Sequence, residues 1–316
     1  MIARASGRRS GQLWAITSYY NPIGYRRRRS NYSLFRERLR LPLLAVELAY
    51  GAGFELEDGD AEIILRRRGS SVLWQKERLL NLALAALPPE CTKVAWIDCD
   101  VFFDDPDWDL ALERALDEAM LVHPFSRVNY LPRDWTPGDD TGASDFTRRS
   151  VAAVIAAGTP PAKAFEHTNE RRLNHATGFV WGARRDLIER HRFYDAAVIG
   201  GGDRLMVCAA FGFLEGAARV HRDHPARRDH FARWGEAFAA DVAGSVAALD
   251  LTLNNLWHGD MINRRPGRRY EGLDEFGFDP AQDIAIDAAG AWRWASDKPG
   301  LHRYLRDYFV GRREDG

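Results

Sequence analysis

The stretch "KVAWIDCD" at residues 93–100 has the pattern of a buried strand that ends in two aspartates, Asp98 and Asp100. On an extended chain alternate residues share a face, so both carboxylates can address one cation. In open α/β sheets, ligands bind beyond the carboxyl ends of the strands. The stretch therefore indicates either a metal site at a sheet edge or an acidic loop that needs no chemistry.

The four aspartates that follow this strand have a simpler explanation. They stand just ahead of a predicted helix and in its first turn, where carboxylates cap free N–H groups and meet the positive end of the helix dipole. We therefore expect no chemistry from Asp104, Asp105, Asp107 and Asp109.

Apolar runs and helical spacings alternate along the first part of the chain. We expect strands at residues 13–22, 43–49, 61–66 and 93–98, and helices at 32–39 and 72–87. This alternation is typical of an α/β fold with a mostly parallel central sheet flanked by helices. Farther on, we expect helices at residues 148–158, 225–246 and 301–315, a strand running into a helix at 177–192, a glycine turn opening a helix at 200–213, and a strand ending in a loop at 251–260.

The composition indicates a globular protein without a strong overall electric field. The chain has 316 residues, of which 46% are hydrophobic and 28% charged, and its formal net charge is −1. Nucleic acid is therefore not an expected partner. Three cysteines without a CxxC pair favour a reducing compartment, so the expected location is the cytoplasm. We find no run of roughly 20 apolar residues that could span a bilayer, which leaves only peripheral membrane contact open.

Two residues in the second half could complete a site with the aspartate pair. His258, in "LWHGD", is a common third ligand for Mn²⁺-like ions when carboxylates supply the rest, although a single histidine is more often structural. Asp203 follows three glycines at a predicted helix start, so it either caps that helix or presents a carboxylate to an acceptor hydroxyl. In the second case the glycines allow a sugar ring to approach the backbone.

Basic and aromatic residues are expected near the same sheet edge. Lys76, at a predicted helix start, could face a diphosphate, whereas Glu77 and Arg78 suggest an exposed charged face as the alternative. Tyr19 and Tyr20, with Tyr25 and Arg26, could stack on and grip a nucleotide base, or they could pack on the rim.

Taken in order, these motifs resemble the GT-A glycosyltransferases, and most nearly the β-1,4-galactosyltransferase-like enzymes. The resemblance rests on Lys76 with "LLN" at residues 79–81, on Asp98-Cys99-Asp100, on "TGFVW" at residues 177–181, on Gly200-Gly201-Gly202-Asp203 and on His258. It extends over about residues 13–260, and Gly202 stands where the family has a second acid.

The resemblance implies one GT-A catalytic domain over residues 1–316. Residues 11–105 would form the nucleotide-binding half, residues 106–265 the donor-sugar and acceptor half, and residues 266–316 a C-terminal extension. The implied activity is metal-dependent transfer of a hexose from a nucleotide sugar, with a UDP-sugar favoured, to the hydroxyl of a carbohydrate or glycoconjugate acceptor. The implied stereochemistry is inversion.

The resemblance also implies a role for each site residue. Asp203 would be the catalytic base. Asp98, Asp100 and His258 would form the site for Mn²⁺ or Mg²⁺, in which Asp100 and His258 bind the ion and Asp98 contacts the ribose or a metal-bound water. The donor-binding residues would be Tyr19, Tyr20, Arg26, Lys76, Asp98, Gly178, Gly201 and Gly202.

Two other functions are compatible with parts of the pattern. Haloacid-dehalogenase-like phosphatases also carry a DxD after an apolar strand, but their motif opens the fold, whereas an α/β pattern precedes it here. A non-catalytic module that binds nucleotides or carbohydrates would equally explain the aromatic residues.

Overall fold

The computed structural model describes residues 12–51, 53–169, 172–173, 175–217, 220, 224–265 and 268–316. Its centre is a seven-stranded sheet with the order β12-β6-β11-β4-β1-β2-β3. The strand bounds are β1 (Leu13–Tyr20), β2 (Leu43–Ala49), β3 (Ile63–Arg68), β4 (Lys93–Ile97), β6 (Leu121–His123), β11 (Val180–Arg184) and β12 (Val246–Ala248).

Strand β11 is antiparallel to both of its neighbours, and the other pairs in this sheet are parallel. The prediction of an α/β fold with a mostly parallel central sheet is therefore confirmed. Since β6, β11 and β12 join the strands of the first 100 residues, the two halves expected from the sequence share one sheet.

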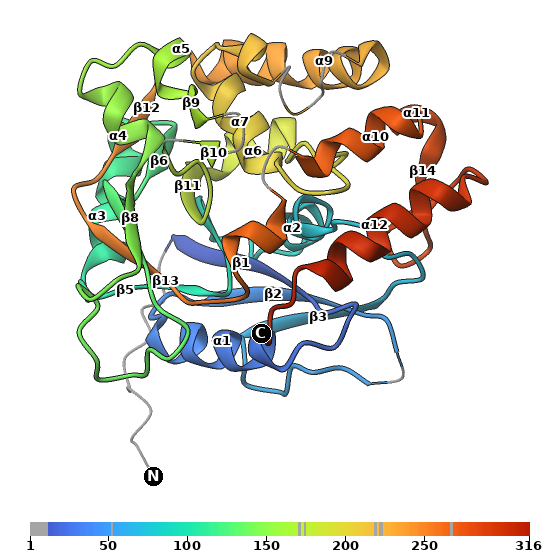
Figure 1. Cartoon of the computed structure of the whole chain (residues 1–316). Coiled ribbons are helices and arrows are strands. Elements are labelled where there is room, and N and C mark those ends of the chain that lie inside the picture. Colours follow the sequence, from blue (N-terminus) through green and yellow to red (C-terminus); the bar gives the residue numbers. More distant parts are fainter. Residues whose placement is uncertain are drawn as a thin grey trace.

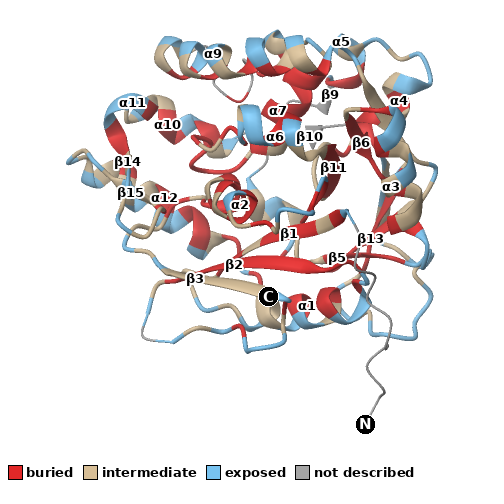
Figure 2. Cartoon of the chain, turned by 180° about the vertical axis from the view of Figure 1, so that it is seen from behind, coloured by how far each residue is buried: buried red, intermediate tan, exposed pale blue. Residues whose placement is uncertain are grey.

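Helices cover both faces of this sheet. Figure 1 shows α1 (Arg26–Arg38) on one side of β1, β2 and β3, and α2 (Lys76–Ala85) and α12 (Pro299–Gly311) on the other side. Helix α3 (Trp108–Glu118) shares the apolar cluster of α1. Helices α6 (Arg185–His191), α7 (Gly202–Ala210) and α9 (Pro225–Val242) share that of α2. Figure 2 shows the buried strands between these two layers.

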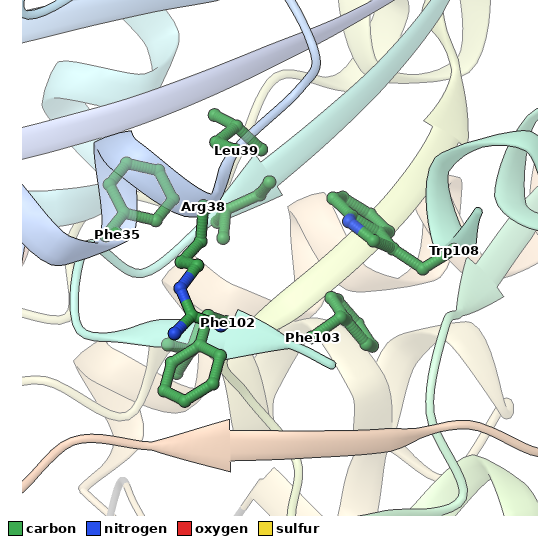
Figure 3. Close-up of a pocket in the computed structure, with 8 residues that line it drawn as sticks. Phe35, Arg38, Leu39, Phe102, Phe103 and Trp108 are labelled. Atoms are coloured by element: carbon green, nitrogen blue, oxygen red, sulfur yellow. The ribbon is translucent and has the colours of Figure 1, made fainter. Parts of the chain in front are cut away.

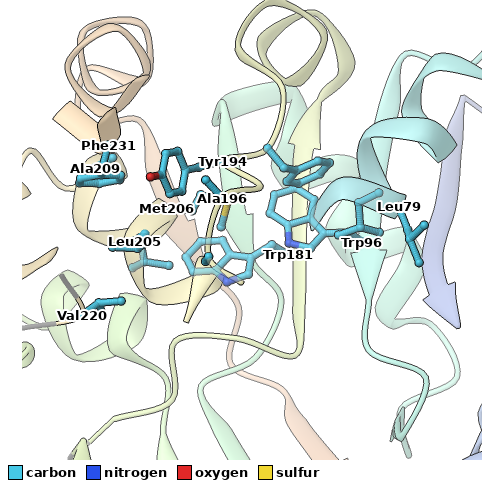
Figure 4. Packing of buried hydrophobic residues seen from close by; sticks show 14 of the residues in the cluster. Leu79, Trp96, Trp181, Tyr194, Ala196, Leu205, Met206, Ala209, Val220 and Phe231 are labelled. Carbon is cyan, nitrogen blue, oxygen red and sulfur yellow. The ribbon is translucent and has the colours of Figure 1, made fainter. Parts of the chain in front are cut away.

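Two tryptophans occupy the middle of the larger core. Trp96 of β4 and Trp181 of β11 are cross-strand partners and both are buried. The ring of Trp96 meets Phe193 edge-on at 5.0 Å, and the ring of Trp181 stacks on His123 at 4.0 Å. Figure 4 shows the two indoles side by side, with Leu79 of α2 beyond one of them. Burial of such large rings stabilises the packing of α2 against β4, the strand that ends just before Asp98.

A second sheet positions the residues that follow the aspartates. Its order is β5-β13-β7-β8, with β5 (Val101–Phe103), β13 (Thr252–Asn255), β7 (Arg127–Tyr130) and β8 (Phe146–Arg149). Because β5 starts directly after Asp100 and pairs with β13, the loop after β13 is brought back to the end of β4.

The remaining elements lie around these two sheets. They are β9 (His167–Asn169), β10 (Arg172–Leu173), β14 (Ile284–Ile286), β15 (Trp292–Trp294), α4 (Val151–Ala156), α5 (Pro161–Ala164), α10 (Glu271–Glu275), α11 (Pro280–Asp283), η1 (Leu214–Ala217), η2 (Met261–Arg264) and η3 (Arg268–Tyr270).

The helix expected at residues 32–39 begins earlier, at Arg26, and the one expected at 72–87 begins later, at Lys76. The other short strands, which are β5 to β10, β12, β14 and β15, were not expected, since runs of two to four residues show no clear periodicity. None of the helices in the described ranges has the length and apolar character needed to cross a membrane.

Candidate functional site

A buried lysine joins two of the predicted site carboxylates. The Lys76 Nζ atom lies 2.6 Å from Asp98 Oδ1, 3.0 Å from Asp203 Oδ1 and 2.9 Å from Asp203 Oδ2. These residues come from three elements, namely the first residue of α2, the turn after β4 and the first turn of α7. The ammonium group therefore fastens all three elements together at the carboxyl edge of the sheet.

The electrostatics of this group favour a charged lysine. Burial works against the ammonium form, but Asp203 and Asp98 more than offset it and raise the pKa of Lys76 well above its ordinary value. Burial raises the pKa of Asp98, and Lys76 opposes this. The side chains of Asp98 and Asp203 keep 29% and 25% of their surface exposed, so both can be reached by a ligand.

Asp100 and His258 form a second pair beside this group. Asp100 Oδ2 lies 3.2 Å from His258 Nδ1, and the same ring nitrogen lies 2.9 Å from the carbonyl oxygen of Leu256. Because a carbonyl oxygen only accepts, Nδ1 carries the proton, and Nε2 keeps its lone pair in the neutral ring. Burial, followed by the charge of Arg264, holds the pKa of His258 well below its ordinary value.

Two of these residues keep donor atoms that could serve a metal ion with few ligands from the protein. Within the described ranges, no group of three or more His, Cys, Asp or Glu side chains is close enough to hold an ion by itself. Lys76 holds Asp98, so the predicted set of Asp98, Asp100 and His258 does not form one group. Asp100 and the neutral His258 still present carboxylate and imidazole donors, and ions such as Mg²⁺ commonly complete their coordination with substrate phosphates.

The predicted glycines make room for acid side chains and for a tyrosine. A Cβ on Gly178 would lie 2.6 Å from Asp203 Oδ2, so the missing side chain leaves space for that carboxylate. A Cβ on Gly202 would overlap Glu77 Oε1, and one on Gly201, where φ is +102°, would overlap the hydroxyl of Tyr270. The expectation that these glycines admit a sugar ring is thus corrected in part, because protein atoms occupy those spaces.

The predicted base-stacking role of Tyr19 and Tyr20 is also corrected. Tyr19 is 2% exposed and packs edge-on against Tyr32, and Tyr20 is 5% exposed and packs against Trp74 and Phe309. Both faces of β1 are covered by helices, so both rings face into apolar clusters. The alternative, in which they pack at the rim, describes them better.

Arg26 lies at the same edge, where it meets the end of the chain. Its side chain is 93% exposed, and its backbone N–H and that of Arg27 donate to the carboxylate of Asp315 at 3.2 and 2.8 Å. Glu314 is buried and accepts from Arg28 at 2.5 and 2.8 Å. The last residues therefore close over the start of α1.

Sequence reasoning gave Lys76 a partly wrong role and missed two neighbours. Lys76 was expected to face phosphates, but both of its acidic partners are protein side chains. Glu77 was expected on an exposed face, yet it is buried, and its Oε1 has no hydrogen-bond partner in the described part of the chain. A signal for Glu77 was Gly202, since a glycine before Asp203 leaves room for a side chain from elsewhere. No sequence signal marked Arg264 among the many arginines.

A small hollow lies between α1, β5 and the start of α3. Figure 3 shows Phe35, Arg38, Phe102 and Trp108 around it, and Arg38 lies over the ring of Phe102 at 5.1 Å. Its lining carries no carboxylate, so we assign it no chemistry.

No protein-family model matches the chain, and no curated protein matches it in sequence. Solved structures do resemble it in part. Glucosyl-3-phosphoglycerate synthase from Mycobacterium tuberculosis, solved with Mn²⁺, UDP and phosphoglyceric acid, is 15% identical over 86% of this chain and 76% of its own, with a TM-score of 0.39. S. aureus TarS is 8% identical over 94% of this chain and 42% of its own, also at 0.39.

The catalytic domain of Drosophila β1,4-galactosyltransferase 7, solved with xylobiose, is 10% identical over 65% of this chain and 62% of its own, with a TM-score of 0.28. All three TM-scores lie below 0.5, so the argument for a function rests on the residues of this chain.

The buried Glu77 yields a prediction about stability. Burial, together with Asp203, raises the pKa of its carboxyl from 4.5 to about 8. A carboxyl whose pKa is raised in the folded state stabilises the fold while protonated, and this stability is lost as pH rises through about 8. Glu77→Gln cannot ionise, so its Tm relative to the wild type should rise between pH 5 and pH 8 in thermal unfolding. The exposed Glu90→Gln should show no such trend, and a difference independent of pH for Glu77→Gln would contradict the prediction.

Proposed function

We propose that the chain is a glycosyltransferase of the GT-A kind, which transfers a hexose from a nucleotide sugar to an acceptor hydroxyl. The single observation that carries the proposal is the arrangement at the carboxyl edge of β4. There, Asp98, Lys76 and Asp203 form one hydrogen-bonded chain, and the pair of Asp100 and His258 lies beside it. A carboxylate for proton abstraction and donors for a metal ion thus come together where α/β sheets bind ligands.

Asp203 is the base in this proposal. The acceptor oxygen forms a bond to the anomeric carbon while the donor C–O bond breaks, and the electron pair of that bond passes to the diphosphate. The acceptor proton goes to an Asp203 carboxylate oxygen. Lys76 holds the side chain of Asp203 in position, since its ammonium contacts both carboxylate oxygens. Attack from the face opposite the leaving group inverts the anomeric centre.

Asp100 and His258 would hold Mn²⁺ or Mg²⁺, which supplies positive charge to the departing diphosphate when bound. Hydrogen bonds fix the geometry of this pair. The N–H of Leu256 donates to the carbonyl of Asp100 at 2.8 Å, and Leu256 in turn accepts from His258. The favoured donor is a UDP-sugar, on the resemblance of the sequence motifs, and the acceptor is a carbohydrate or glycoconjugate.

The donor can be tested by thermal stabilisation with nucleoside diphosphates and nucleotide sugars, with and without Mn²⁺. A ligand at about 100 times its Kd should raise Tm by roughly 5 °C. We expect the largest rise with UDP or a UDP-sugar plus Mn²⁺, and we expect His258→Ala to lose the increment due to Mn²⁺. His191→Ala, on α6 and paired with Asp241, is the control and should keep it. If Mn²⁺ does not strengthen the binding of any of these nucleotides, the metal assignment is wrong. Turnover of a generic phosphate ester would instead indicate a phosphatase.

Asp203→Asn tests the base. Loss of general-base catalysis should lower kcat by roughly 10²–10⁴-fold. Binding of the nucleotide sugar should persist, because the amide keeps the shape of the side chain. Transfer kinetics and equilibrium binding separate the two effects, with the exposed Asp229→Asn on α9 as the control. Undiminished transfer by Asp203→Asn would remove it from this role, and binding without any transfer by the wild type would point to a binding module.

Gly178→Ala tests the space that Asp203 occupies. The added methyl would lie 2.6 Å from Asp203 Oδ2 and would push the carboxylate off Lys76. We expect kcat to fall at least tenfold, because a small misplacement of a reacting group is costly. Gly53→Ala is the matched control, since no atom lies within 4 Å of its added methyl. Equal kcat values for the two variants would show that the position of Asp203 does not depend on Gly178.

A further inference from the structure

Four cations around the candidate site already have partners. Lys76 is held by Asp98 and Asp203. The other three are Arg28, which donates to Glu314 and to the Tyr20 carbonyl, Arg312, which donates to Glu314 and Tyr308, and Arg269, which donates to Tyr308 and Tyr270. A diphosphate that entered the site would have to compete with protein groups for each of them.

Arg264 differs from these four. It is the last residue of η2, six positions after His258, and it is only partly exposed. Its Nε atom is buried without a hydrogen-bond partner, as is that of Arg269, but Arg269 donates through its other two nitrogens. Across the residues that the structure describes, the guanidinium of Arg264 makes no hydrogen bond, and no carboxylate lies within 4.0 Å of it. The charges of Asp100 and Glu314 act on Arg264, and its own charge acts on Asp98.

The surroundings of Arg264 belong to the candidate site. Its charge acts on Asp98 and Asp100 at the end of β4 and on His258 after β13, so the guanidinium lies within electrostatic range of all three. Glu314 pairs with two other arginines, Arg28 and Arg312, and not with Arg264. The site therefore holds a guanidinium with unused donors next to the residues proposed to meet the diphosphate.

We propose that Arg264 binds the diphosphate of the donor and stabilises its charge as it departs. The inference rests on the proposed function and extends it, because it gives this chain affinity for a diphosphate that does not require a metal ion. A guanidinium presents several N–H donors in a fixed plane and pairs with phosphate oxygens through two parallel hydrogen bonds. The sequence predicted that Lys76 would contact the diphosphate. We assign this contact to Arg264, whose N–H groups are not used by protein acceptors in the described residues.

A merely structural arginine would behave differently. Burial and the neighbouring Arg312 lower the pKa of Arg264 to about 10, so the protein surroundings disfavour its charge. Replacement of a buried cation that lacks an ion pair by a neutral side chain should therefore raise the Tm of the ligand-free protein. An arginine kept to balance Asp98 and Asp100 should instead lower the Tm when it is replaced. The two roles are thus separable without any measurement of activity.

The test uses inorganic pyrophosphate and UDP with the full chain in EDTA. Binding by calorimetry and thermal stabilisation are compared for the wild type, Arg264→Gln, Arg264→Lys and Arg265→Gln. Arg265 follows on the same turn and is exposed, so it is the matched control. We expect Arg264→Gln to weaken pyrophosphate binding about 10–100-fold, since hydrogen bonds to charged groups contribute on this scale. Arg264→Lys should retain part of the affinity, and Arg265→Gln should retain all of it.

Three results would overturn the inference. They are pyrophosphate binding by Arg264→Gln within threefold of the wild type, a lowered Tm of ligand-free Arg264→Gln, and no pyrophosphate binding by the wild type in EDTA. In each case, stabilisation of the wild type by UDP with Mn²⁺ would leave the proposed function standing. If the wild type bound no nucleoside diphosphate under any condition, the proposed function and this inference would both fail.

Discussion

The contact of the Lys76 ammonium with two carboxylates is the interaction on which the candidate site depends. Without it, Asp98 and Asp203 would face one another as like charges in a partly buried place, where the charge of Asp203 already raises the pKa of Asp98. The ammonium is held there because α2 packs through Leu79 and Leu80 into the main core. The geometry of the acids is therefore a consequence of apolar packing several residues away.

Gly178 and Gly202 matter because little space is left around these charged side chains. Asp203 fits beside Gly178, and Glu77 fits beside Gly202, only because neither glycine has a Cβ. Glu77 thus fills from α2 the space of the side chain that position 202 lacks. A neutral, buried acid there adds no further negative charge to the group formed by Asp98 and Asp203 near neutral pH, since its pKa is raised to about 8.

Local patterns predicted much of this correctly. The apolar run before Ile97 predicted the strand that ends there, and the three glycines predicted the helix start before Asp203. The rule that ligands bind beyond strand ends marked Asp98 and Asp100 as candidate site residues at the edge of the sheet. The burial of Tyr20 was not predictable, because Phe309 lies 289 positions farther along the chain. Asp104 was expected to be a helix-start acid. It instead accepts hydrogen bonds from Thr141 and Asn254, since β13 joins that sheet from far along the sequence.

The charges of the C-terminal segment explain why Arg264 has no acidic partner in the described part of the chain. The backbone of Arg312 and Arg313 lies against Gly259, directly after His258, and this contact brings Glu314 close to the candidate site. Glu314 is buried, and Arg28 and Arg312 hold its pKa well below the ordinary value although burial opposes them. One carboxylate satisfies two arginines, and a third arginine enters the same region from η2. Desolvation of a cation that has no carboxylate close to it costs free energy. On the proposed role of Arg264, this cost serves binding, and binding sites commonly differ from the rest of a protein in this way.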